Sequence, residues 1–432
     1  REEKFMDKMA DVLGRAGAWC GQNKYLSAIK NAFQNFMPLT IAGAIGVLWC
    51  NVLVNDQTGL GLFFKPIMAL DFLNPAFQAV NFCTISCITV GITLGIAQEI
   101  GVWNMGAERA GYIPGLVGLA AWLSVTNTSH MVEGAKEAFT GIAGNELGAT
   151  GLFTGMIIGV LSVELFCFFE KQDALKIKMP EQVPPGVARA FEVLVPATIT
   201  LIITACIGSA CYNLTGLYLN DVIKNGIQGP LGAVGATIPG VMIIYLVIML
   251  FWLVGIHGNN MLSAVKEALF TPLALENVEK FNKGEKPTNI INMYALQMWG
   301  EFGGSGVTIG LVIAIMIFGK REDNKAIASL SLVPGLFNIN ETVTFGVPMV
   351  LNPILGIPFV VAPLITIIIG YVLTVIGFCP VACLTVPWTT PPIVFGFLAC
   401  GANVMGAVTQ AILIVVSTVI YVPFLISYEK YQ

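Results

Sequence analysis

The sequence predicts an all-α polytopic membrane protein, and three observations support this fold class. First, 56% of the 432 residues are hydrophobic and only 11% are charged, whereas soluble domains carry about a quarter charged residues. Second, apolar stretches recur along the chain, and most approach the length of about 20 residues that a helix needs to cross a bilayer. Third, lysine and arginine are concentrated in particular loops, as the positive-inside rule requires.

Nine apolar stretches are predicted to cross the membrane. They cover residues 28–54, 77–99, 111–125, 150–169, 191–213, 234–256, 304–319, 357–378 and 403–427. The segments 257–300 and 326–350 do not fit this pattern, because polar residues, glycine and proline interrupt them. Irregular backbone is tolerated at membrane depth only where protein or a water-filled cavity covers it, so we expect these two segments to be covered in that way.

The basic loops predict an orientation for the first half of the chain. Residues 1–30 and 171–189 are rich in lysine and arginine, whereas the loop 126–149 is mainly acidic. Both basic segments are therefore expected in the cytoplasm, and the loop outside. Four predicted crossings separate the basic segments, which is self-consistent. The second half stays open, because Lys320, Arg321 and Lys325 also favour the cytoplasm while the number of crossings before them is not fixed by hydropathy.

A proline-rich stretch divides the chain into two halves. Three prolines lie between Met179 and Gly186, and proline removes a backbone donor and disfavours helix in the residue before it. We therefore predict an irregular cytoplasmic connector here. The unusual polar residues lie after it, which indicates a scaffold followed by a domain that carries the function.

Two ionisable residues in apolar surroundings are the main candidates for function. Such residues are costly in a membrane and are functional hypotheses by default. His257 follows the apolar run that ends at Trp252, and Glu341 lies in an asparagine-rich turn. The alternative interpretations are structural: a helix-end imidazole satisfied by a backbone carbonyl for His257, and a carboxylate capping a helix N-terminus for Glu341.

Carboxylate, imidazole, amide and indole groups together suit a sugar, which presents hydroxyls and C–H faces. Trp252, Trp299 and Trp388 lie beside the polar stretches and are candidate sugar platforms. Trp388 stands out, because the prolines in 386–392 exclude an ordinary spanning helix. The alternative for each tryptophan is a place in the interfacial aromatic belt.

Other residue types predict no cofactor, metal or nucleic-acid site. No nucleotide-binding glycine motif and no basic run that could follow a phosphate backbone is found. The cysteine pairs Cys83/Cys87 and Cys379/Cys383 have helical spacing but no histidine to complete a zinc set, so we expect small buried or lipid-facing residues. Arg109, in a short loop, is expected to be solvated. Energy for transport must come from another component.

Three motifs occur together in this sequence. They are 176–180 with 186–191, the Gly-Ile-His-Gly at 255–258, and Asn340-Glu341 followed by Phe345-Gly346, Pro348 and Asn352-Pro353. In combination they resemble the lactose/cellobiose/diacetylchitobiose family of enzyme IIC, the permease of bacterial phosphoenolpyruvate-dependent sugar phosphotransferase systems. The resemblance runs from about Phe5 to the C-terminus. The family often has proline directly after Asn-Glu, whereas this chain has Thr342, which we expect to alter the turn and keep the carboxylate.

The resemblance implies an architecture. About ten transmembrane helices and two re-entrant hairpins, near 257–290 and 326–350, are expected in the bacterial inner membrane. Residues 1–175 would form a scaffold that dimerises, 176–190 the cytoplasmic connector, and 191–432 a sugar-binding transport domain. That domain would move the sugar by an elevator-like displacement within a homodimer.

The resemblance also implies roles for individual residues. Glu341 would bind the sugar hydroxyl that is phosphorylated and act as its base, with His257 orienting that hydroxyl or offsetting charge. Asn340 and Asn260 would be hydrogen-bonding neighbours. The substrate would be a β-linked disaccharide, of the cellobiose or N,N'-diacetylchitobiose type, phosphorylated on its 6-hydroxyl. The donor would be a phosphocysteine on IIB, with IIA upstream, so the chain would take part in catalysis only together with IIB.

Two other function classes compete with this hypothesis. In a proton-coupled sugar symporter, Glu341 and His257 would relay protons, and free sugar would accumulate under a proton gradient. A membrane receptor or scaffold would tolerate replacement of both residues without loss of ligand flux. Enzyme IIC differs from both because its uptake depends on phosphorylated IIB.

Overall fold

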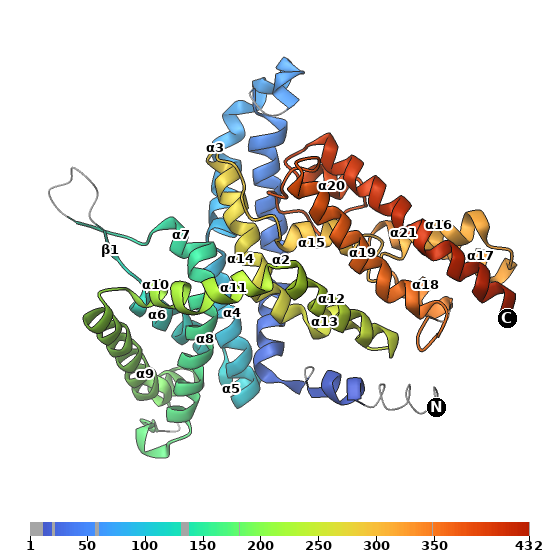
Figure 1. Ribbon diagram of the computed structural model, residues 1–432. Helices are drawn as coiled ribbons and strands as arrows, with labels where there is room; N and C mark the ends of the chain where they lie inside the picture. The colour runs from blue at the N-terminus through green and yellow to red at the C-terminus, as the bar shows by residue number, and fades with distance from the viewer. Residues whose placement is uncertain are drawn as a thin grey trace. The chain divides into compact units, whose positions relative to one another are not determined.

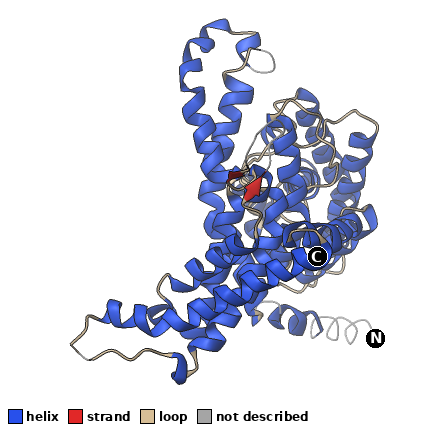
Figure 2. Ribbon diagram, turned by 90° about the vertical axis from the view of Figure 1, so that its left-hand side faces the viewer, coloured by secondary structure: helices blue, strands red, loops and turns tan. Residues whose placement is uncertain are grey.

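The computed structural model describes residues 12–19, 22–56, 60–130, 138–180, 182–347 and 349–431. Within these residues almost all regular structure is helical (Figure 2). Two short strands, β1 (Ser129–His130) and β2 (Phe139–Thr140), pair antiparallel with Ser129 opposite Thr140. The all-α prediction is therefore confirmed. Parts of the basic N-terminal segment and of the acidic loop, and also Glu181 and Pro348, lie outside the described residues.

Several described helices are long and apolar enough to cross a membrane. Five meet this condition: Lys24–Leu53, Thr150–Glu170, Pro185–Thr215, Gly356–Val375 and Val404–Lys430. Two helix pairs that are bent at a short break bring the number to seven if each pair is one span. The chain is thus a multi-pass membrane protein, and the larger number of ten crossings stays a prediction.

The chain folds into two compact units. The N-terminal unit comprises Asn23–Thr40 and Phe82–Leu231. In it α4, α6, α8 and α9 pack against one another around the buried Trp122 (Figure 1). Its helices are the first part of α2 (Lys24–Leu48), α4 (Ile88–Met105), α5 (Ala107–Ala110), α6 (Ile113–Val125), α7 (Gly144–Leu147), α8 (Ala149–Glu170), α9 (Pro185–Thr215) and α10 (Leu219–Ile223).

The predicted connector is irregular, as its prolines require. This holds for residues 176–180 and 182–184, which contain no helix, whereas α9 begins at Pro185 and makes residues 185–190 of the predicted connector helical. Proline suits the first turn of a helix, where its missing N–H has no intrahelical partner. Residues 191–231 pack with the N-terminal unit, whereas the sequence places the functional division at 191. That functional division remains a prediction.

The C-terminal unit is built mainly from Ile41–Asn81 and Gly232–Gln432. Its core forms where α19 packs against α12, α15 and α21, with α16 beside α21 (Figure 1). Its helices are α3 (Asn74–Asn81), α12 (Ile238–Leu253), α13 (Gly258–Met261), α14 (Ser263–Asn282), α15 (Met293–Gly300), α16 (Ile309–Phe318), α17 (Glu322–Leu336), α18 (Glu341–Gly346), α19 (Gly356–Val375), α20 (Val394–Ala399) and α21 (Val404–Tyr431); α11 (Gly229–Gly235) lies at the boundary. In both stretches predicted to be hairpins, a long and a short helix are joined by a turn.

Two predicted crossings are broken or shortened. The crossing expected from residue 77 is broken at Cys87, between the π-helix Phe82–Ser86 that continues α3 and the start of α4 at Ile88. The crossing expected from residue 304 begins only at Ile309. The preceding residues 303–307 form a loop in which three glycines and Val307 have positive φ. Hydropathy does not detect this loop, because it is short and uncharged and is followed by a strongly apolar run.

Candidate functional site

His257 lies at a helix start in the C-terminal unit. It is the N-cap residue of α13, and its Nδ1 accepts a hydrogen bond from the backbone N–H of Asn260 at 3.3 Å. The structural alternative predicted an imidazole that bonds to a backbone carbonyl at a helix end. His257 does lie at a helix end, but its ring bonds to a backbone N–H. Because Nδ1 accepts, the neutral ring carries its proton on Nε2. That nitrogen remains available for a second partner.

The second partner of His257 is Glu341. The His257 Nε2 lies 3.7 Å from the Glu341 Oε1, and the two side chains are 39% and 46% exposed. Glu341 opens α18, where the positive end of the helix dipole favours an anion. The pair comes from segments 84 residues apart in sequence, and its partial exposure leaves the carboxylate open to a ligand.

The loop 303–306 joins the segments that carry His257 and Glu341. Asn340 is buried and donates from Nδ2 to the Ser305 carbonyl at 2.9 Å and to the Thr344 hydroxyl at 3.1 Å. The Ser305 hydroxyl donates to the Asn259 Oδ1 at 2.7 Å. Gly304 lies against Asn340, so that a Cβ there would be 2.7 Å from the Asn340 Cβ. One loop therefore holds the residues beside both members of the pair.

The three candidate tryptophans differ in their surroundings. Trp252 is buried, its ring centroid lies 4.4 Å from that of His257, and its Nε1 donates to the Asn259 Oδ1 at 3.4 Å. Trp388 is 45% exposed, and its carbonyl accepts from the Asn338 Nδ2 at 2.5 Å. The structure thus links both tryptophans to the segments of the His257–Glu341 pair.

No hydrogen bond or ring contact among the described residues links Trp299 to this cluster, although it shares a hydrophobic core with Trp252. Its ring is buried in the core, where a Cβ on Gly370 would lie 2.3 Å from it. Asn260, by contrast, is exposed beside His257. Of the three tryptophans, only Trp388 offers an exposed ring.

The sequence analysis missed an ion pair next to this site. Lys266, 5% exposed on α14, pairs with the Glu301 carboxylate, which also accepts the Tyr245 hydroxyl at 2.6 Å. The signal was present, because Lys266 is a charged residue in the polar stretch 257–300 and Glu301 directly follows this stretch. It was not used, because hydropathy does not show that these two charges meet.

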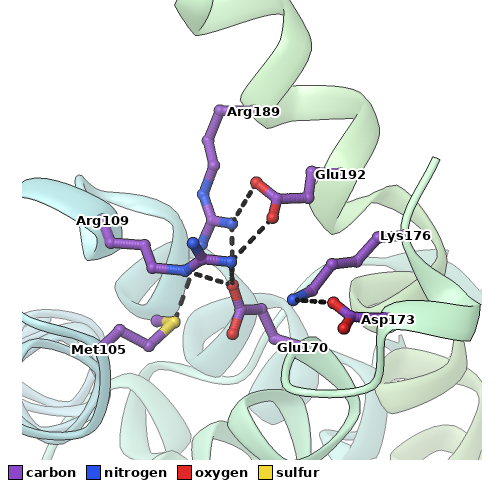
Figure 3. A network of polar contacts seen from close by, with 7 residues as sticks. All are labelled: Met105, Arg109, Glu170, Asp173, Lys176, Arg189 and Glu192. Carbon is purple, nitrogen blue, oxygen red and sulfur yellow. Dashed lines mark hydrogen bonds and ion pairs between the residues drawn. The ribbon is translucent and has the colours of Figure 1, made fainter. Parts of the chain in front are cut away.

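A second polar network lies in the N-terminal unit (Figure 3). The buried Glu170, at the end of α8, accepts from the Arg109 Nε at 2.9 Å and from the Arg189 Nη1 at 2.8 Å. Glu192 accepts from both arginines at 2.8 Å. The hydrogen bond to Glu170 raises the pKa of Arg109 above its usual value. The Arg109 side chain is 46% exposed, as predicted, but it is also held in this network. The mutual pairing of these charges indicates a structural role.

The contacts of the cysteines also differ from those that their spacing in the sequence suggests. Cys379 and Cys383 are buried as predicted, but they lie in an irregular segment after α19 and not on a helix. The Cys379 Sγ lies 3.9 Å from the Cys400 Sγ. In the part of the chain that the structure describes, no group of three or more His, Cys, Asp or Glu residues could hold a metal ion.

Comparison with known proteins gives a consistent result. The family model "Phosphotransferase system, EIIC" matches residues 30–363. The oligo-beta-mannoside-specific EIIC component of Bacillus subtilis is 32% identical over 99% of this chain and 94% of its own length. The cellobiose-specific EIIC component of Lactococcus lactis is 30% identical over 98% of each chain.

A solved structure is similar over almost the whole chain. The transporter ChbC, the IIC component of the N,N'-diacetylchitobiose-specific phosphotransferase system, matches with a TM-score of 0.87 and 29% sequence identity. The match covers 96% of each chain. The arrangement of helices described above is therefore one already found in an experimentally determined fold.

Proposed function

This chain belongs to the phosphotransferase system EIIC family, and we propose that it imports a β-linked disaccharide of the cellobiose or N,N'-diacetylchitobiose type. The sugar specificities in the names of its relatives support this substrate class. The proposal places the protein in the bacterial cytoplasmic membrane, as a homodimer that works with phosphorylated IIB and, upstream, IIA. The observation that carries it is the exposed His257–Glu341 pair.

In the proposed reaction Glu341 is the base. Its carboxylate takes the proton of the sugar 6-hydroxyl while the hydroxyl oxygen attacks the phosphorus of the IIB phosphocysteine in line. The O–P bond forms, the S–P bond breaks, and the cysteine thiolate of IIB leaves with the bonding electron pair. The His257 Nε2–H, 3.7 Å from the carboxylate, orients Glu341 and offsets its charge. Once Glu341 has released this proton to water, the negatively charged product lies next to a carboxylate, so it is bound poorly and does not return.

The neighbouring residues would bind and orient the sugar. The exposed ring of Trp388 offers a face for the C–H groups of a pyranose, and the exposed Asn260 offers an amide beside His257. Trp252 would act by supporting the His257 ring, and the buried Asn340 by fixing the start of α18. Trp299, predicted as a platform, is assigned to the core in this proposal because its ring is buried.

The test uses membrane vesicles supplied with the soluble phosphotransferase proteins and radiolabelled cellobiose, N,N'-diacetylchitobiose or lactose. Wild type should accumulate sugar phosphate only when IIB is present. Glu341→Gln should abolish this while keeping sugar binding within about one order of magnitude, because the amide still hydrogen-bonds but cannot accept the proton. Glu322→Gln, at an exposed carboxylate on α17, is the matched control and should retain activity.

Two outcomes would contradict the proposal. Accumulation of free sugar under a proton gradient without IIB would establish the symporter, in which the same pair relays protons. Full IIB-dependent activity in Glu341→Gln would show that this carboxylate is not the base.

A further inference from the structure

The buried pair of Lys266 and Glu301 has no part in the reaction proposed above. The Lys266 side chain is 7% exposed and that of Glu301 is 15% exposed. The Lys266 Nζ also lies 5.4 Å from the centroid of the Tyr245 ring, and the Tyr245 hydroxyl donates to the same carboxylate. Helices α12 and α14 are thereby both fastened to the end of α15. Such burial of two charges is costly, so it calls for an explanation.

Glu301 lies two residues before Gly303, where the loop that contacts both segments of the site begins. Its backbone carbonyl accepts from the Gly304 N–H at 3.0 Å. Four residues of this segment have positive φ: Gly303, Gly304, Gly306 and Val307. Glycine loops have few side chains to hold them, and conformational entropy favours their disorder. The loop is held at its end by the Tyr421 hydroxyl, which donates to the Gly306 carbonyl at 2.7 Å, and the anchored Glu301 side chain fixes its beginning.

The loop is hydrogen-bonded to both segments that carry the His257–Glu341 pair. The Ser305 carbonyl accepts from Asn340, the residue before Glu341, and the Ser305 hydroxyl donates to Asn259, two residues after His257. The Gly303 N–H donates to the Asn338 Oδ1 at 2.6 Å. A shift of the loop would thus move the segment that carries the base.

From these contacts we infer that Glu301, fastened by Lys266 and Tyr245, is a positioning residue for sugar phosphorylation: it fixes the loop 303–306 that aligns Glu341 with His257. This inference deepens the proposed function and rests on it. The ion pair matters because a carboxylate held by an ammonium group is a stronger anchor than one neutral hydrogen bond. The role is one of geometry, since nothing assigns Glu301 a contact with the sugar.

The experiment compares three variants of the full-length protein, purified in detergent and reconstituted with phosphorylated IIB. Lys266→Met/Glu301→Ala removes the anchor without leaving an unpaired buried charge. Lys266→Arg keeps the charge. Lys283→Met removes an exposed ion pair to Glu279 on the same helix and is the matched control. The readouts are the sugar Kd, the phosphorylation turnover at saturating sugar, and the thermal midpoint of unfolding.

We expect the double variant to lose at least tenfold in turnover while its sugar Kd changes by less than threefold. Lys266→Arg should retain at least half of the turnover, and Lys283→Met all of it. A folded double variant with turnover within twofold of wild type would overturn the inference, as would a loss that Lys266→Arg shares in full.

A double variant that fails to fold would be replaced by Tyr245→Phe, which removes only the hydroxyl bonded to Glu301. This variant should lose at least threefold in turnover, and unchanged turnover would overturn the inference. Failure of the proposed function is distinguishable from all of these outcomes, because then wild type itself would show no IIB-dependent phosphorylation.

Discussion

The loop between α15 and α16 gives a prediction in which two glycines can be compared. Gly304 and Gly284 have φ of +88° and +73°. An alanine at either position costs about 1–2 kcal/mol for the backbone conformation alone. The two sites differ in what a methyl group would meet. At Gly284 nothing lies within 4 Å, whereas at Gly304 the new Cβ would lie 2.7–2.8 Å from three atoms of the Asn340 side chain.

That contact adds the cost of overpacking at a buried site, roughly 1–3 kcal/mol. Gly304→Ala should therefore destabilise the protein by about 2–5 kcal/mol, and Gly284→Ala by about 1–2 kcal/mol. Asn340 has little room to yield, because its amide is bonded to Ser305 and Thr344. We expect Gly304→Ala also to lower sugar phosphorylation, since Glu341 follows Asn340.

The assay is the thermal midpoint of unfolding in detergent, together with IIB-dependent phosphorylation of the sugar. Gly304→Ala should show the lower midpoint and the lower activity of the two variants. Equal midpoints and equal activities would refute the reasoning, because the loss would then come from the backbone conformation and not from the contact with Asn340.

Three further predictions follow from single contacts. Trp388→Ala should weaken sugar binding about tenfold, or roughly 1.4 kcal/mol, because an aromatic face is lost. Trp388→Phe should weaken it by less, and calorimetry measures both affinities. Equal affinity in wild type and both variants would exclude stacking. Asn277→Ala removes four hydrogen bonds of a fully buried amide and should destabilise the fold by roughly 2–4 kcal/mol, whereas Asn213→Ala, at an exposed site with one long bond, should leave the thermal midpoint unchanged. Glu170→Gln should cost roughly 1–2 kcal/mol, because a neutral amide replaces the buried carboxylate that both arginines bond, while Glu192 still pairs with both of them. Asp173→Asn, at an exposed carboxylate, should have little effect; similar midpoints for these two variants would contradict the structural role of the network.

The sequence located the polar stretches of the candidate site but not the contacts within them. His257 and Glu341 were identified singly, because a charge in an apolar segment is costly wherever it is. The structure adds that they lie 3.7 Å apart. Lys266 and Arg109 show the opposite case. Each is an ordinary charged residue in sequence, and only the fold reveals that it pairs with a carboxylate that is partly buried (Glu301) or buried (Glu170).

For the tryptophans and cysteines too, the sequence identified the residues, and only the structure showed their surroundings. Trp252 and Trp299 were plausible sugar platforms from their neighbours in sequence, but both rings are buried. Cys379 and Cys383 have helical spacing, yet their segment is irregular and the Cys379 thiol meets Cys400. Spacing predicts a shared helix face only where a helix forms, and the prolines that follow Cys379 act against one.

By itself the sequence determined that this protein is an all-α chain crossing the membrane several times, with a proline-rich break and candidate functional residues in the later half. Hydropathy and proline content suffice for this, because the bilayer acts on each segment separately. Only the tertiary structure decided which residues form the site, where the glycine loop 303–306 replaces helix, and which charges are paired. Those features depend on contacts between segments distant in the chain, and such contacts leave no periodic signal in any one segment.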